Sequence, residues 1–300
     1  MELGMIGLGR MGANMAERLT RGKHRVVGLD PSPEARARAQ AKCAAVVASP
    51  AELAVALTPP RVVWLMVPSS AVDDTIARLL PVLAADDVIV DGGNSLYHDS
   101  QRRAREVSER AFHYVDAGTS GGVWGLENGY SLMIGGEPQV VARVRPVFET
   151  LAPAPDRGWA HVGPSGAGHF VKMVHNGIEY GLMQAYAEGF AIMERKREFA
   201  LDLATVAEVW RHGSVVRSWL LDLTVAALRD DARLEGVAPY VADSGEGRWT
   251  VAEAIALDVP APVITHSLIA RLRSRERNSF ADRLLAALRG QFGGHEVKRR

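Results

Sequence analysis

Short apolar segments alternate with helix-like segments through the first half of the chain. The apolar segments are residues 3–8, 26–29, 62–67, 88–90 and 114–117. Between them, stretches such as 50–57 and 70–83 carry apolar residues at helical spacing, with Ser or Pro near their starts. Short strands that alternate with helices are typical of a parallel sheet covered by helices. The first half is therefore predicted to be an α/β domain.

The second half of the chain has a different pattern. Beyond Gly163 the strand-like runs largely stop, and three stretches have the apolar spacing of helices: 168–195, 203–229 and 265–288. We therefore predict an α/β domain at 1–162 and an all-α C-terminal domain at 163–300. The candidate junction is 152–158, because its Pro and Gly residues disfavour regular structure.

The composition limits the classes of protein that the chain can represent. Of its 300 residues 47% are hydrophobic and 23% are charged, which is enough to bury the cores of two medium domains. Lys plus Arg equals Asp plus Glu at 35 each, so no overall charge attracts nucleic acid or an anionic membrane. The longest apolar run, 62–67, is far shorter than the roughly 18 residues of a membrane span. A strand at 3–8 leaves no room for a secretion signal and Cys43 is the single cysteine, so we expect a cytoplasmic protein without disulfides.

A glycine motif follows the first predicted strand directly. Its residues are Gly7, Leu8, Gly9, Arg10, Met11 and Gly12, and a helix-compatible run comes next. In the dinucleotide-binding fingerprint, the three glycines permit a tight turn, close approach of a pyrophosphate, and packing of helix on strand. The N-terminus of the helix offers N–H groups to the anion. This context favours a cofactor site in a Rossmann-type doubly wound sheet over a purely structural turn.

Asp30 ends the second predicted strand, 23 residues after Gly7. Its carboxylate can accept hydrogen bonds from the adenosine ribose hydroxyls and would repel a 2′-phosphate. At an effective dielectric constant near 20, two unit charges about 4 Å apart interact by roughly 4 kcal/mol. Residues 31–33 supply no cation to offset this repulsion. We therefore predict NAD in preference to NADP; a compatible alternative is that Asp30 caps the following helix.

Five polar residues recur on one face of the first helix of the second half. They are Lys172, His175, Asn176, Glu179 and Tyr180, and the other faces are mainly apolar. A solvent-facing stripe would look similar, but such stripes usually mix Lys, Glu, Arg and Gln. A lysine, a histidine and a glutamate that share a cleft could lower the lysine pKa and supply both a base and an acid.

Two glycine-rich segments, 91–95 and 116–122, follow predicted strands. Ligands of open α/β sheets bind at the carboxyl ends of the strands, and small residues there can offer N–H groups to a carboxylate. We therefore expect loops at both segments that contribute to a ligand site. Either segment alone would more often be an ordinary turn.

Several motifs resemble known enzymes. The β-hydroxyacid dehydrogenase superfamily has motifs similar to Gly7-x-Gly9-x-Met11-Gly12, Ser120-Gly121-Gly122 and Gly166-x-Gly168-x-x-x-Lys172-x-x-x-Asn176. Within it, Asp91-Gly-Gly-Asn94-Ser and the run 172–181 resemble the 6-phosphogluconate dehydrogenase family, as do 245–250 and 289–295. The short chain and the loop Leu-Asp-Pro-Ser at 29–32 resemble its short, NAD-preferring branch, because the long form has a larger helical domain and an arginine in this loop.

The resemblance implies a metal-independent oxidative decarboxylation. Lys172 would take the proton of the substrate 3-hydroxyl while hydride leaves C3, and Asn176 would orient that hydroxyl. The resulting β-keto acid would lose CO2 while protonated Lys172 stabilises the charge on the C3 oxygen. Glu179 would then protonate the enol carbon, which gives ribulose 5-phosphate.

The resemblance also implies the binding residues. The cofactor would contact residues 7–12, Asp30, Val67 and Asn94. The carboxylate end of the substrate would contact Asn94, Ser120, Gly121, Gly122 and His175, and the phosphate end Tyr180, Arg248, Thr250 and Arg277. Arg289 and His295 would reach the site of a neighbouring subunit, in a homodimer or homotetramer. A frayed basic end is the alternative for this tail.

Two other functions fit part of the pattern. A 3-hydroxyisobutyrate or tartronate semialdehyde type dehydrogenase would share the glycine motif and the pair Lys172 and Asn176. Its small substrate would have no use for Tyr180 and Arg248. A non-enzymatic nucleotide-binding protein of the same fold would not need Lys172 and Glu179 on one helix face.

Overall fold

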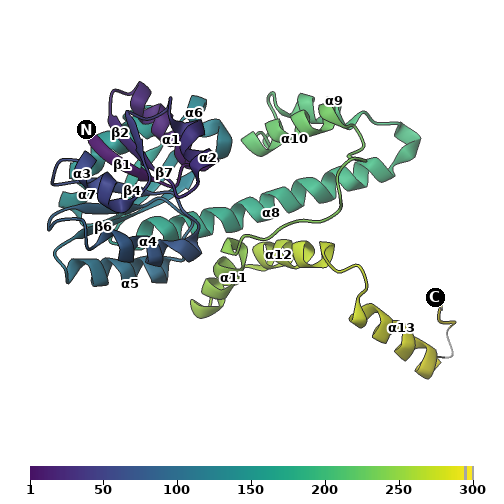
Figure 1. Ribbon diagram of the computed structural model, residues 1–300. Coiled ribbons are helices and arrows are strands. Elements are labelled where there is room, and N and C mark those ends of the chain that lie inside the picture. The colour runs from purple at the N-terminus through teal and green to yellow at the C-terminus, as the bar shows by residue number, and fades with distance from the viewer. Residues whose placement is uncertain (294–295, 299–300) are drawn as a thin grey trace. The chain divides into compact units, whose positions relative to one another are not determined.

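The computed structural model describes residues 1–293 and 296–298 (Figure 1). The chain divides into two compact units, Met1–His175 and Asn176–Arg300. Helix α8, Ala167–Arg195, starts in the first unit and ends in the second. The predicted order, an α/β part followed by a helical part, is confirmed. Among the described residues, no helix is long and apolar enough to cross a membrane.

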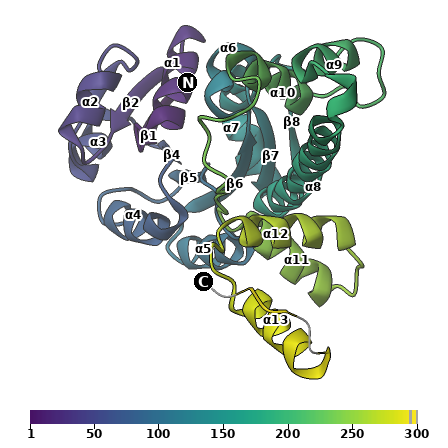
Figure 2. The ribbon, with the colours of Figure 1, turned by 90° about the vertical axis from the view of Figure 1, so that its right-hand side faces the viewer.

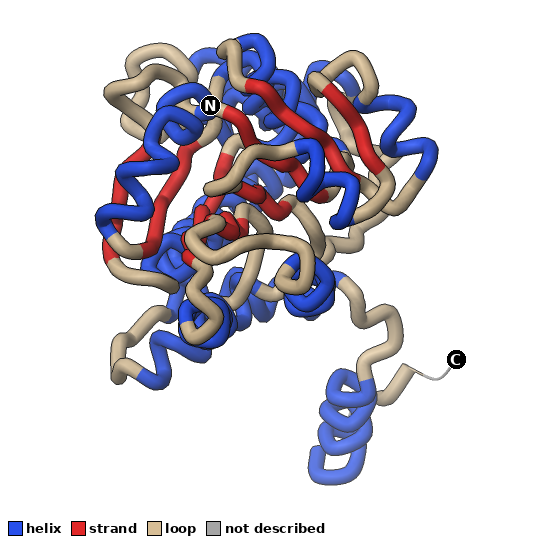
Figure 3. Tube along the Cα trace, turned by 60° about the vertical axis from the view of Figure 1, so that its left-hand side comes forward, coloured by secondary structure: helices blue, strands red, loops and turns tan. Residues whose placement is uncertain are grey.

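The first unit is built on one eight-stranded sheet, drawn in red in Figure 3. Its strands are β1 Glu2–Ile6, β2 Arg25–Leu29, β3 Ala45–Val47, β4 Val62–Leu65, β5 Val88–Asp91, β6 His113–Ser120, β7 Ser131–Gly136 and β8 Trp159–Gly163. Their order is β3-β2-β1-β4-β5-β6-β7-β8, so the chain winds outward from β1 to one edge and from β4 to the other. This is the doubly wound topology of Rossmann-type domains, as predicted.

Helices cover both faces of this sheet. They are α1 Arg10–Arg21, α2 Pro33–Ala39, α3 Pro50–Ala56, α4 Val72–Leu79, α5 Tyr97–Ser108, α6 Gly125–Asn128 and α7 Pro138–Leu151, with short 3-10 turns at Ser69–Ala71 and Gly122–Trp124. Figure 2 shows α1 and α7 on one side of the strands and α4 and α5 on the other. Trp64 of β4 belongs to one core cluster, whereas its neighbours Val63 and Leu65 belong to the other. Both faces are buried, which is why the strands are continuous apolar runs rather than alternating ones.

The sheet differs from the prediction in three respects. Strands β3, β7 and β8 were not predicted. The prediction of a parallel sheet is wrong at one position: β6 and β7 pair antiparallel, because 121–130 return the chain without a crossover. The segment 152–158 contains no helix or extended strand, but it joins α7 to β8 of the same sheet. It is therefore not the domain junction.

The second unit is helical in the part that the structure describes. It contains the C-terminal part of α8, then α9 Leu203–Trp210, α10 Trp219–Asp230, α11 Glu246–Ala256, α12 Pro262–Ser274 and α13 Phe280–Gly293, with a 3-10 turn at Arg197–Phe199. Phe190 of α8 packs with Ala207 and Leu221 in a core cluster of this unit. Helices α8, α9 and α10 are therefore held together by one small apolar core.

Two stretches predicted as single helices are each divided. In 203–229 a new helix starts at α10, where the Ser218 hydroxyl accepts the Leu221 N–H. In 265–288 α13 starts where the Ser279 hydroxyl accepts a backbone N–H. Each serine satisfies an N–H group that a helix start leaves unpaired, so the local sequence favours a new helix at that point.

Candidate active site

The glycine motif 7–12 forms the turn between β1 and α1. Gly7 has a φ of +92°, and a Cβ there would lie 2.4 Å from the Met66 carbonyl oxygen. A Cβ at Gly12 would lie 1.9 Å from the Gly7 carbonyl oxygen, so α1 packs directly on this turn. Gly9, the N-cap of α1, has no atom within 4 Å of its Cβ position. Gly7 and Gly12 are thus closely packed, as the dinucleotide fingerprint requires. Gly9 is open, and a pyrophosphate could approach the backbone there.

Asp30 lies beside this turn and is held by two backbone groups. One carboxylate oxygen accepts the Leu8 N–H at 2.8 Å, and the other accepts the Ser32 N–H at 2.8 Å. The N-cap of α2 is Ser32, whose hydroxyl accepts the Ala35 N–H. The alternative role of Asp30 as a helix cap is therefore wrong. The two N–H groups fix the orientation of its carboxylate.

Arg36 of α2 also approaches Asp30. Its guanidinium donates to the carbonyl oxygens of Asp30 at 2.7 Å and Pro31 at 3.0 Å. The sequence argument considered only residues 31–33 as sources of a cation and missed this one. Arg36 lies in the first turn of α2, from which its side chain reaches the 30–31 backbone. Asp30 therefore has a cation close to it.

The other predicted cofactor residues of the first unit lie around the same sheet edge. Leu8 is buried, Met11 half-buried and Arg10 exposed at the start of α1. Val67 follows β4 and packs against the core on one face of the sheet. Asn94 is exposed in the loop that follows β5.

The loop after β5 is organised by Asp91, which is fully buried. Its carboxylate accepts the Gly93 N–H at 3.1 Å and the Ser95 hydroxyl at 2.8 Å. Both donors flank Asn94. The position of Asn94 therefore depends on a buried carboxylate.

The second glycine-rich segment is mostly strand. Strand β6 runs to Ser120 and pairs with β7, so the prediction of a loop from Asp116 is wrong; the loop starts at Gly121. Gly121 and Gly122 have φ values of +133° and +53°, which favour glycine. A Cβ at Gly122 would meet no atom within 4 Å, so its backbone is accessible.

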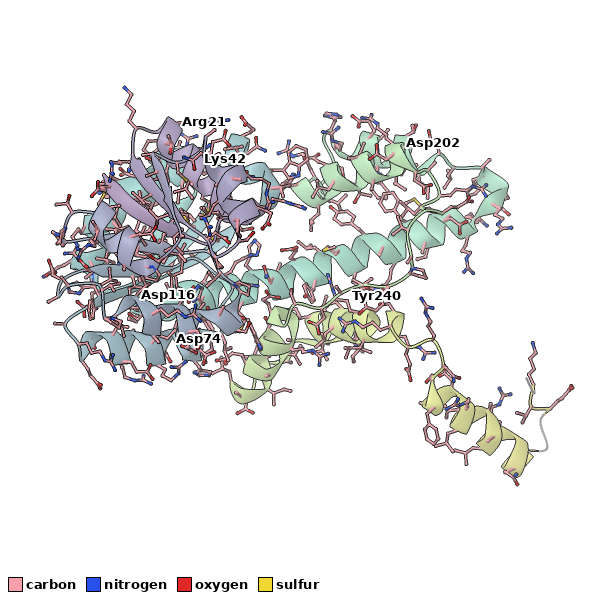
Figure 4. All side chains as sticks on the ribbon, in the orientation of Figure 1. Arg21, Lys42, Asp74, Asp116, Asp202 and Tyr240 are labelled. Atoms are coloured by element: carbon pink, nitrogen blue, oxygen red, sulfur yellow. The ribbon has the colours of Figure 1, made fainter. Side chains whose placement is uncertain are left out.

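Helix α8 begins directly on the sheet. A Cβ at Gly168 would lie 2.4 Å from the Met133 carbonyl oxygen of β7, and one at Gly118 would lie 2.6 Å from Cβ of Lys172. Asp116 of β6, labelled in Figure 4, accepts the N–H groups of Gly166 at 2.7 Å and His169 at 2.9 Å. A carboxylate at this end also interacts favourably with the helix dipole. Strand β6 thus fixes the start of the helix that carries Lys172.

Lys172 is the first residue of the predicted polar stripe, and only 8% of it is exposed. Its Nζ lies 3.4 Å from Nδ1 of His175. Asn176 and Glu179 follow on α8 four and seven residues later, so the helix places them on the same face. The predicted helix is confirmed, and it carries an amine, an imidazole and a carboxyl group at successive turns.

The second unit contains a group of residues, here called the cationic cluster, that consists of Tyr180, Arg248 and Arg271. Tyr180 is its centre. It is 5% exposed, and a Cβ at Gly247 would lie 2.6 Å from its ring. The guanidinium of Arg271 lies 3.5 Å from the ring centroid, in cation–π geometry. The Tyr180 hydroxyl is 3.4 Å from that of Ser244. Arg271 was not predicted, because nothing in the sequence shows that α12 returns to Tyr180.

Arg248 lies in the same region. Its guanidinium donates to the Asp243 carboxylate at 2.5 Å. Burial raises the pKa of Asp243, but the hydrogen bonds from Arg248 and from the Gly245 N–H outweigh it and lower the pKa below its usual range. The ion pair orients a half-exposed guanidinium that keeps further N–H groups for an anion.

The remaining predicted substrate residues differ in how exposed they are and in whether the structure describes them. Thr250 is buried, and its hydroxyl donates to the Glu246 carbonyl oxygen at 2.8 Å. Arg277 is exposed beyond the end of α12, and Arg289 is exposed on α13. His295 lies outside the described residues.

The chain matches two family models over most of its length. Residues 2–163 match the NAD binding domain of 6-phosphogluconate dehydrogenase, and residues 168–285 match the C-terminal domain of 6-phosphogluconate dehydrogenase. The first match covers the unit with the glycine motif. The second covers most of α8 and the cationic cluster.

Individual relatives carry the same names. An NAD(+)-dependent, decarboxylating 6-phosphogluconate dehydrogenase of Haloferax volcanii is 47% identical over 302 residues, which cover 100% of this chain and 99% of that protein. An NADP(+)-dependent one of Bacillus subtilis is 36% identical over 99% of this chain and 65% of that protein. The solved 6-phosphogluconate dehydrogenase of Plasmodium falciparum is 29% identical, with a TM-score of 0.83 over 100% of this chain and 66% of that one.

Proposed function

The chain belongs to the 6-phosphogluconate dehydrogenase family, and we propose that it oxidises and decarboxylates 6-phosphogluconate with NAD, giving ribulose 5-phosphate and CO2. The observation that carries this proposal is the stripe on α8, where Lys172, Asn176 and Glu179 share one face and Asp116 caps the helix start. NAD is supported as the cofactor by the relative that is named NAD(+)-dependent. It is also supported by the Asp30 carboxylate, which lies beside the open turn at Gly9. We propose domain limits of 1–162 for cofactor binding and 163–300 for substrate binding and subunit contact.

Lys172 acts as the base in the proposed reaction. Its neutral amine takes the proton of the 3-hydroxyl, which Asn176 orients. An NAD held by the glycine turn 7–12 and Asp30 would supply the acceptor for the hydride that leaves C3. Low exposure supports this role, because few water molecules can compete with the substrate hydroxyl for the amine. His175, 3.4 Å from Nζ, limits the positions that the amine can adopt.

The carbon–carbon bond to the carboxylate then breaks. Its electrons move toward the C3 oxygen, and protonated Lys172 donates a hydrogen bond to the developing charge. Glu179, two turns further along α8, protonates the carbon that has lost CO2. Asn94 and the backbone at Ser120, Gly121 and Gly122 hold the carboxylate until it leaves.

The phosphate end is assigned to the cationic cluster. Tyr180, Arg248 and Thr250 keep the predicted role, and we add Arg271 because its guanidinium stacks on Tyr180. Two guanidinium groups suit a dianionic phosphate, for which arginine provides paired N–H donors. A small substrate without phosphate would make no use of these two guanidinium groups, which disfavours the 3-hydroxyisobutyrate or tartronate semialdehyde alternative.

We also propose a cytoplasmic homodimer or homotetramer. Arg289 and His295 would contribute to the site of a neighbouring subunit. Mass measurement in solution and the loss of activity on removal of 289–300 test this arrangement.

A substrate panel tests the proposed function. The enzyme would be assayed with 6-phosphogluconate, gluconate, 3-hydroxyisobutyrate and glycerate, each with NAD and with NADP, in the presence of EDTA. We expect reduced cofactor to form mainly from 6-phosphogluconate and NAD, with one CO2 for each cofactor reduced. Turnover of 3-hydroxyisobutyrate or glycerate in preference to 6-phosphogluconate would refute the proposal.

A further inference from the structure

A buried arginine lies beneath the loop that carries Asn94. Arg103 of α5 has a side chain only 3% exposed, yet it makes four hydrogen bonds. Its Nε and Nη2 donate to the two carboxylate oxygens of Asp73, at 2.8 and 3.2 Å. Its Nη1 donates to the Ser95 hydroxyl at 3.0 Å and to the Asp91 carboxylate at 3.3 Å. One planar group thus joins α4 to the loop after β5.

The Asp91 carboxylate is the acceptor that ties this loop together. One oxygen accepts the Gly93 N–H, and the other accepts the hydroxyls of Ser95 at 2.8 Å and Tyr114 at 2.9 Å. Burial raises the pKa of Tyr114 well above its usual value and the charge of Asp91 raises it further, so this hydroxyl keeps its proton. The loop is therefore anchored on both sides of Asn94, at Gly93 and at Ser95.

Arg103 also balances the negative charge in this arrangement. Asp91 is fully buried, and a buried carboxylate is stable only when a cation or several donors compensate it. Arg103 is the cation that contacts Asp91. The hydrogen bond from Arg103 lowers the pKa of Asp73, whose half-exposed carboxylate holds the guanidinium from the other side. Asp73 therefore fixes the direction in which Arg103 points.

We infer that Arg103 is a positioning residue that holds the 91–95 loop so that Asn94 can contact the substrate and the cofactor. This inference rests on the proposed function of Asn94. Arg103 itself lies behind the loop and needs no contact with either ligand. Its effect on the reaction is transmitted through Ser95 and Asp91.

Lysine cannot replace Arg103 in this role. An ammonium group is a single point of charge, whereas the guanidinium spans Asp73 on one edge and Ser95 with Asp91 on the other. Arg103→Lys keeps the compensating charge, so the protein should still fold, but the loop loses one anchor. A displacement of about 1 Å at a substrate-positioning group costs up to about 100-fold in rate, so we expect kcat/KM to fall about 10- to 100-fold.

The same helix offers a matched control. Arg102 also pairs with Asp73, at 3.0 Å, and with Glu106, and its side chain is half-exposed. It contacts the outer part of the network without reaching Asp91 or Ser95. Arg102→Lys should therefore leave kcat/KM within about twofold of the parent, as surface ion pairs contribute little.

A double-mutant cycle with Asn94→Ala distinguishes positioning from general destabilisation. If Arg103 acts through Asn94, Arg103→Lys should lower kcat/KM by no more than about twofold in the Asn94→Ala background. If the double variant loses kcat/KM by the product of the two single-variant losses, the inference is overturned. An impaired Asn94→Ala beside a fully active Arg103→Lys would overturn it as well, while leaving the proposed function intact.

Hydrogen–deuterium exchange provides a test that needs no substrate. Amides of the 91–96 segment should exchange faster in Arg103→Lys than in the parent and the Arg102→Lys control. Should Arg103→Lys fail to fold, Asp73→Asn takes its place, with the same direction of change and a smaller effect. Unchanged exchange in this segment would refute the inference whether or not the enzyme turns over 6-phosphogluconate.

Discussion

Replacing Asp30 by Asn should shift cofactor preference toward NADP. The Asp30 carboxylate lies beside the glycine turn, where two backbone N–H groups hold it in place. We expect its charge to repel a 2′-phosphate. Asn has the same shape and can still accept one of these N–H groups. The other hydrogen bond is lost, which costs about 1 kcal/mol of stability.

The magnitude follows from the charge and its exposure. A unit charge about 4 Å from another costs roughly 4 kcal/mol at an effective dielectric constant near 20 and about 1 kcal/mol in bulk water. Asp30 is half-buried, so we take about 1 to 3 kcal/mol. This corresponds to a rise of about 5- to 150-fold in the ratio of kcat/KM for NADP to that for NAD. Arg36, which contacts the Asp30 carbonyl oxygen, is the cation that we expect to pair with the phosphate.

The assay compares initial rates with both cofactors at saturating 6-phosphogluconate. Adding Arg36→Met to Asp30→Asn should reverse part of the gain with NADP, since the cation is removed. Arg38→Met, on the exposed side of the same helix, is the matched control and should have no such effect. A ratio that does not change in Asp30→Asn would refute the reasoning.

Two further substitutions test the assigned roles. Glu179→Gln should slow protonation of the enol by about 100- to 10,000-fold. In reactions stopped at successive times, ribulose 5-phosphate should then appear later than reduced cofactor. Simultaneous appearance of the two would contradict Glu179 as the acid. Arg271→Lys should raise KM for 6-phosphogluconate about 10-fold or more by removing stacking and paired N–H donors. Arg277→Lys tests an arginine that the sequence predicted at the phosphate; a larger effect at Arg277 would show that the phosphate lies elsewhere.

The strands that the sequence predicted are those whose side chains are buried on both faces. Val62–Leu65 is fully buried, and such a run is visible as continuous apolar residues. Strand β3 has only three half-buried residues, and β8 is mainly exposed, so neither leaves an apolar pattern. Strand β7 ends in Gly135-Gly136, which reads as a turn in the sequence. Strands β3 and β8 lie at the two edges of the sheet and β7 lies beside β8. All three are defined by pairing with a neighbour, which sequence spacing does not show.

The candidate site was predictable where its residues lie on one helix. The stripe from Lys172 to Tyr180 is spaced by helix geometry alone. The contacts that place this helix were not predictable, because Asp116 caps it from a strand about 50 residues earlier in the chain. Arg103 and Arg271 were missed for the same reason. Each acts through a partner that only the fold brings close.

The measurement that tests the account most directly is single-turnover hydride transfer in Lys172→Met. Methionine has a similar length and suits a side chain that is 8% exposed, so folding and NAD affinity should be retained. We predict that formation of reduced cofactor from 6-phosphogluconate falls at least about 100-fold, the usual contribution of a general base. Hydride transfer near the parent rate, with NAD bound as tightly, would contradict the assignment of Lys172 and the mechanism built on it.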